Sequence, residues 1–147
     1  MPIFNYTTTI PYQQSVNEIQ TMLSKAKATA ILQEYHEGIV THISFKINTP
    51  HGVMAFRLPA NLEKVYAVLN KTPKVEPRYK TKEHAARVAW RIIKDWVKAQ
   101  LAIIETEMVT LTQIFLPFAQ DATGDTVYEK FEKNGFPSVT YQPEKKQ

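Results

Sequence analysis

The sequence predicts a single α+β domain in which an antiparallel meander of three to four strands packs against one long helix and several shorter helices. A length of 147 residues suits one domain. Residues 29–58 alternate apolar and polar side chains between turn signals, as half-buried strands do. Residues 82–108 repeat apolar side chains at helical spacing. Residues 1–141 are therefore expected to form the domain, and residues 142–147 a frayed tail.

A strand and a helix are expected at the start of the chain. Residues 3–10 are rich in Thr and aromatic side chains, which favours a strand, and Pro11 ends it. Ser15 and Glu18 have the spacing of a capping box, so a helix is expected to follow to about Lys27.

Residues 29–35 and 39–47 predict a β-hairpin around a two-residue loop, residues 37–38, in which Gly38 supplies a positive φ. This loop would pair His36 with Ile39, Glu34 with Thr41, Leu32 with Ile43 and Ala30 with Phe45. One face would then carry Ala30, Leu32, Ile39, Ile43, Phe45 and Ile47, and the other Ile31, Gln33, Tyr35, Val40, His42, Ser44 and Lys46.

A third strand is expected at residues 53–58, after a turn at residues 48–52. Its alternation directs Met54, Phe56 and Leu58 toward the core and Arg57 outward.

Helices fill the rest of the chain. Asn61 is a suitable cap for a helix to about residue 70, and Thr81 for the long helix at residues 82–108. The Pro-containing stretch 72–80 between them reads as an exposed basic loop. Two short helices are expected at residues 111–118 and 126–133.

The charge of the chain is unevenly distributed. The net charge of +4 conceals a basic middle, because residues 71–98 hold nine basic and three acidic side chains. Arg87, Arg91, Lys94 and Lys98 follow one another at intervals of four, three and four residues, which places them on one helix stripe. Such a stripe can track phosphates, although a solvated helix face remains the alternative.

Aromatic side chains near these cations suggest contacts with unstacked bases. Tyr79 in the basic loop is the best stacking candidate, whereas Trp90 and Trp96 are expected in the core. The candidate nucleic-acid residues are Arg78, Tyr79, Lys80, Lys82, Arg87, Arg91, Lys94 and Lys98. A second candidate surface is the outer sheet face with Tyr35, His42, Lys46 and Arg57, for which an ordinary wet or helix-covered face is the favoured reading.

Several function classes are disfavoured. The absence of Cys excludes disulfides and thiolate zinc sites, and the four His residues do not occur at metal-ligand spacing. No phosphate-cradling glycine motif is found. With no signal peptide and no membrane-length apolar run, a cytoplasmic protein without metal or cofactor is expected. Pro2 could act as a catalytic amine as in tautomerase-like enzymes, but the elements after it lack the β-α-β repeat of that family.

Parts of the sequence resemble short proteins of tailed phages and integrated mobile elements that carry no established activity. The similarity is in residues 88–101 (VAWRIIKDWVKAQL), 114–118 (IFLPF), 49–52 (TPHG) and 56–59 (FRLP). The resemblance implies a setting in which small cytoplasmic proteins serve replication, recombination or interference with host defence.

The sequence therefore predicts a non-enzymatic accessory protein that binds DNA or RNA through the basic loop and helix, with little sequence specificity. One alternative is an interaction protein that docks an acidic partner, such as a host defence factor. Another is a protein that sequesters a nucleotide.

Overall fold

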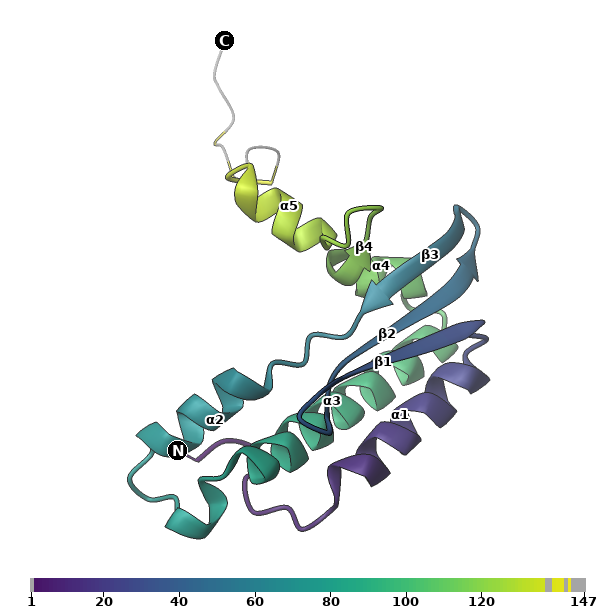
Figure 1. Cartoon of the computed structure of the whole chain (residues 1–147). Helices are drawn as coiled ribbons and strands as arrows, with labels where there is room; N and C mark the ends of the chain where they lie inside the picture. The colour runs from purple at the N-terminus through teal and green to yellow at the C-terminus, as the bar shows by residue number, and fades with distance from the viewer. Residues whose placement is uncertain (1, 137–138, 142, 144–147) are drawn as a thin grey trace.

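A computed structural model of the chain describes residues 2–136, 139–141 and 143, in which one four-stranded antiparallel sheet packs against helices (Figure 1). The predicted α+β class is confirmed. Apart from Pro143, the predicted tail at residues 142–147 lies outside the described residues. The elements are α1 (Tyr12–Lys25), β1 (Ala30–His36), β2 (Ile39–Thr49), β3 (Gly52–Arg57), α2 (Leu62–Lys71), the 3₁₀ helix η1 (Pro77–Tyr79), α3 (Lys82–Glu105), α4 (Leu111–Phe115), the 3₁₀ helix η2 (Leu116–Phe118), β4 (Ala119–Gln120) and α5 (Val127–Lys133).

The sheet has the strand order β1-β2-β3-β4, and every neighbouring pair is antiparallel. The two-residue loop of the β1–β2 hairpin is confirmed, and both of its residues have a positive φ, 51° at Glu37 and 80° at Gly38. Two residues with positive φ form the kind of turn whose twist matches that of the flanking strands. The predicted inward positions of β3 are confirmed, since Phe56 and Leu58 are almost fully buried. The two-residue strand β4 has no clear sequence signal.

A β-bulge changes the predicted hairpin register. Near the loop, His36 faces Ile39 as expected, but Thr41 is an extra residue on β2, and Glu34 faces His42 instead. From there on every β1 residue faces a partner one position further along β2. Because side chains alternate, the slip exchanges faces: Val40 is buried, and Leu32 is 58% exposed. The predicted face that joined Leu32 with Ile39 and Ile43 is therefore wrong.

Helices α1 and α3 lie side by side on one face of the sheet, and α4 packs beside them (Figure 1). Phe115 of α4 is fully buried against Phe45 and Phe56, with ring centroids 5.6 and 5.9 Å away. Trp90 of α3 is also fully buried, and its indole N–H donates to the Val40 carbonyl at 2.7 Å. Val40, which directly precedes the bulge, thus supplies the acceptor for the largest core side chain.

The first predicted strand does not form. Residues 3–8 make consecutive turns, closed by the bonds from Tyr6 N to Ile3 O and from Thr8 N to Asn5 O. Asn5 adopts a φ of 65°, which Asn tolerates better than most residues and which no strand contains. Ile3 and Tyr6 pack instead on a small apolar cluster beneath α2. The composition of this segment favoured a strand, but its apolar and aromatic side chains pack in this cluster instead.

The predicted capping box of α1 is also wrong. The helix begins at Tyr12 after Pro11, and Ser15 lies inside it, fully buried and facing α3. The helix ends at Lys25, two residues earlier than expected, and α3 ends at Glu105 rather than Met108. The caps predicted at Asn61 and Thr81 are confirmed, because their side chains accept bonds from the backbone N–H groups of Lys64 and His84.

Candidate nucleic-acid interface

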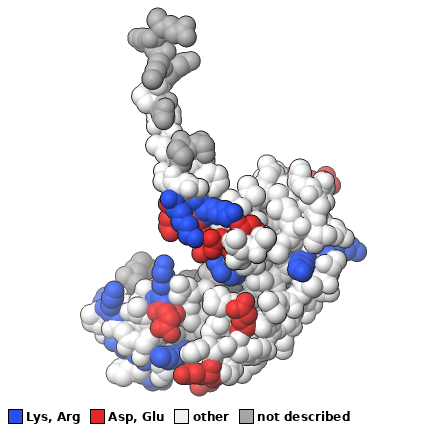
Figure 2. Space-filling view, turned by 45° about the horizontal axis from the view of Figure 1, so that its top comes forward, with Lys and Arg blue, Asp and Glu red and all other residues white. Residues whose placement is uncertain are grey.

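The connection between α2 and α3 holds the densest group of cations in the chain. We call residues 71–82 the basic segment. It contains η1, and its one carboxylate is Glu76. In Figure 2, Lys and Arg atoms lie at several places on the end of the molecule that this connection forms, with Asp and Glu atoms among them. The cations of the basic segment are Lys71, Lys74, Arg78, Lys80 and Lys82.

Apolar contacts fix the backbone of the basic segment to the domain. Val75 is 2% exposed and packs with Leu69 of α2 and Ala85 of α3. Backbone bonds from Val75 N to Thr72 O and from Tyr79 N to Glu76 O close its turns. The lysines thus project from a connection that is tied down between its two helices.

Tyr79 has a structural part in this anchoring. Its ring lies 4.9 Å from the His84 ring and 5.9 Å from the Tyr6 ring, measured between centroids. The Arg78 guanidinium lies 4.7 Å from the Tyr79 centroid, within reach of a cation–π contact. These contacts occupy the ring predicted to stack on bases.

The lysines of the segment are the cations best placed for an anionic ligand. Arg78 pairs with Glu76 at 2.9 Å, although 68% of its side chain remains exposed. Lys71, Lys74, Lys80 and Lys82 make no ion pair with the described part of the chain. Lys71 and Lys74 were outside the predicted site, but the count of charges over residues 71–98 already included them.

The predicted helix stripe is divided by the fold. Arg87 pairs with Glu83 one turn earlier at 2.9 Å. Arg91 and Lys94 point toward α1, and their side chains are only 16% and 13% exposed.

One carboxylate of α1 meets both of these cations. Glu18 lies 3.1 Å from Arg91 and 3.6 Å from Lys94. Partial burial alone would raise the pKa of Glu18. A hydrogen bond from Gln14 and the charges of Arg91 and Lys94 outweigh this and lower the pKa below its usual value. Two members of the stripe therefore hold α1 to α3, and Lys98 remains as its exposed member.

The outer sheet face carries three of the four residues predicted there. His42, Lys46 and Arg57 share it, because Ser44 between the first two faces Arg57. Tyr35 belongs to the opposite side, where its hydroxyl donates to Gln33 at 2.8 Å. Arg57 is engaged by Glu129 at 2.5 Å. This face therefore lacks the continuous aromatic platform that single-strand binders use.

A groove of about 520 Å³ opens between the end of the β1–β2 hairpin and the start of α2. Its ionisable lining includes Glu34, Glu37 and Glu63 against Lys82, together with His36 and His42. Three carboxylates repel phosphate groups, so the groove does not favour the nucleotide-sequestering alternative. Within the described residues, no group of three or more His, Asp or Glu side chains is arranged to hold a metal ion.

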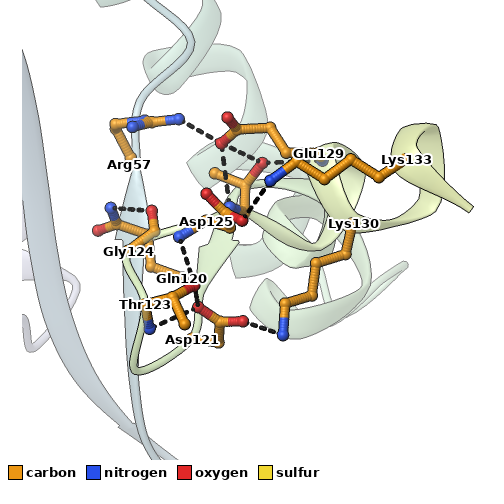
Figure 3. A network of polar contacts seen from close by, with 10 residues as sticks. Arg57, Gln120, Asp121, Thr123, Gly124, Asp125, Glu129, Lys130 and Lys133 are labelled. Carbon is orange, nitrogen blue, oxygen red and sulfur yellow. Dashed lines mark hydrogen bonds and ion pairs between the residues drawn. The ribbon is translucent and has the colours of Figure 1, made fainter.

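A polar network that the sequence did not indicate links α5 to the sheet (Figure 3). Glu129 accepts from the N–H and hydroxyl of Thr126 and from Arg57. The Thr126 N–H bond is the main cause that lowers the pKa of Glu129, and the Arg57 charge adds to it.

Two lysines of α5 complete the network. Lys130 pairs with Asp121, and Lys133 with Asp125 at 2.7 Å. The bond from Lys130 is the main cause that lowers the pKa of Asp121, and the Asp125 bond raises the pKa of Lys133. Because these charges compensate one another, the network holds α5 against the sheet and leaves few cations free to bind an anionic ligand.

Comparisons with known proteins place the chain in no family: no family model matches it, and neither the curated proteins nor the solved structures give a match. The described residues include no helix with the length and apolar character needed to cross a bilayer. The sheet is antiparallel throughout these residues and so lacks the β-α-β arrangement of tautomerase-like enzymes.

Proposed function

We propose that this protein is a non-enzymatic accessory protein, of the kind that phages and mobile elements encode, which binds nucleic acid through the basic segment. The observation that carries the proposal is the display of four lysines that make no ion pair with the described part of the chain, on an anchored connection between two helices. Cations already neutralised by the fold gain little from a phosphate. Unpaired cations can release condensed counterions from a polyanion when they bind.

The same observation sets the expected specificity. Lys is a compact charge on a flexible stem and contacts phosphate without reading base edges. Tyr79 is engaged with Arg78 and His84, so base stacking is not part of the proposed interface. We therefore expect weak sequence preference and an affinity that falls steeply with salt.

The alternative of an acidic protein partner rests on the same surface. A linear polyanion should bind more tightly as its length grows, whereas a folded acidic partner should bind with fixed stoichiometry. Oligonucleotides of increasing length therefore separate the two.

The test is a fluorescence-anisotropy titration of labelled single- and double-stranded oligonucleotides at two salt concentrations. The Lys74→Glu, Lys80→Glu double variant removes two cations of the basic segment. The matched control, Lys25→Glu with Lys27→Glu, makes the same change of charge at exposed positions outside both candidate surfaces.

We expect the affinity of the basic-segment variant to fall by at least about tenfold, and its salt slope by about two. The control variant should change far less. Equal losses in both would show a general effect of net charge, and no binding by the wild type at low salt would refute the proposal. Circular dichroism of each variant checks that the fold is kept.

A further inference from the structure

The first strand of the sheet has one unpaired edge. In the order β1-β2-β3-β4, β1 pairs with β2 on one side and with no strand of the described chain on the other. Figure 1 shows β1 at the margin of the sheet. Five of its seven residues are exposed. An open edge of this kind offers a row of N–H and C=O groups to another strand.

The hydrogen bonds identify which residues face outward. The Ile43 carbonyl accepts from Leu58, beyond the end of β3, so Ile43 bonds on that side. The Lys46 carbonyl accepts from Thr29, which precedes β1. Because backbone directions alternate along a strand, Ser44 and Lys46 bond to their β1 partners Leu32 and Ala30. The backbone groups of Ile31, Gln33 and Tyr35 therefore point away from the sheet.

This edge lacks the usual protection against pairing. Natural edge strands carry Pro, Lys, a bulge or inward-pointing charges. β1 has the sequence AILQEYH, in which Glu34 is the one Asp, Glu, Lys or Arg, and the bulge lies on β2 instead. The apolar side chain of Leu32 is 58% exposed and that of Tyr35 63% exposed. Two large side chains thus stand beside the open edge.

We propose that the β1 edge pairs with the β1 edge of a second copy of this chain, antiparallel and centred on Gln33. In this register Gln33 faces Gln33 of the second copy, and Ile31 faces Tyr35. The three outward-facing residues of each copy then form about six backbone hydrogen bonds across a twofold axis. Ile31 is an apolar partner for the exposed Tyr35 ring.

The self-pairing register is compatible with the charges of the strand. The register places Glu34 opposite Leu32 and His36 opposite Ala30, so no two like charges stand directly across from each other. The two four-stranded sheets would join into one continuous sheet. This inference does not depend on nucleic-acid binding, so a test of one proposal does not decide the other.

Sedimentation velocity over a concentration series is the first test. The wild type should move from 16.9 kDa toward twice that mass as its concentration rises. Gln33→Pro removes one outward N–H and leaves the bonds of Leu32 and Glu34 to β2 in place, so this variant should remain monomeric. Gln33→Ala keeps the N–H and should still dimerise. A wild type that is monomeric at every concentration overturns the proposal.

The register has its own test, which does not depend on the Pro variant folding. The chain contains no Cys, so each single Cys variant has one thiol. Gln33→Cys should form a disulfide-linked dimer on mild oxidation, because the paired Cα atoms would lie about 5.5 Å apart. Tyr35→Cys is the matched control, since residues 35 of the two copies would be about 13 Å apart. Cross-linking of both variants, or of neither, overturns the register.

Discussion

Glu18 provides a sharp test of how α1 is held against α3. Glu18→Gln keeps the size of the side chain and removes the charge that faces Arg91 and Lys94. Exposed ion pairs contribute about 0–1 kcal/mol, and breaking a fully buried pair costs about 3–5 kcal/mol. These cations are mostly buried, whereas Glu18 is 35% exposed. We expect the variant to lose about 1–2 kcal/mol of unfolding free energy.

Urea and thermal unfolding measure this loss. For a domain of this size, about 1–2 kcal/mol corresponds to a fall in Tm of about 3–6 °C. The matched control is Glu63→Gln, at an exposed glutamate that makes no ion pair in the described part of the chain. Its unfolding free energy should change by less than about 0.5 kcal/mol. If both variants unfold alike, the Glu18 pairs do not stabilise the helix contact.

Two further predictions concern the core and the carboxylates. Trp90→Phe leaves the buried Val40 carbonyl without its donor and the pocket underfilled, and urea unfolding should show a loss of about 2–4 kcal/mol; a loss below about 1 kcal/mol would contradict this. The lowered pKa values of Glu18, Asp121 and Glu129 contribute stability above the unfolded carboxyl pKa of about 4, and this contribution is lost as the pH falls further. Glu129→Gln should therefore flatten the fall of the urea midpoint below about pH 4, and an unchanged profile would count against it.

The parts of the fold that were predicted correctly depend on neighbours in the sequence. Asn61 and Thr81 cap helices because their side chains reach backbone N–H groups three residues ahead. Gly38 closes a hairpin because a two-residue loop requires a positive φ. Such local geometry is encoded within a few residues, so a pattern can identify it.

The parts that were missed depend on contacts between distant segments. The bulge at Thr41 lies beside a contact between β2 and α3, in which the Val40 carbonyl accepts from Trp90. The stripe of cations was identified correctly as a helix face. Its division could not be foreseen, because Glu18 lies more than 70 residues away from Arg91 in the sequence. Both the register of β1 and the ion-pair partners of the cations depend on such distant contacts, so the sequence pattern did not predict them.

The bulge also decides how the hairpin can change its length. The inward positions Val40 and Ile43 are separated by an odd number of steps, which regular alternation does not allow. Deleting Thr41 would leave two steps between them, so both could face inward in a regular strand without the bulge. In protein engineering, and in the divergence of related sequences, the loss of Thr41 should therefore be accepted more readily than the loss of Ser44 or Lys46, which separate inward residues at regular spacing.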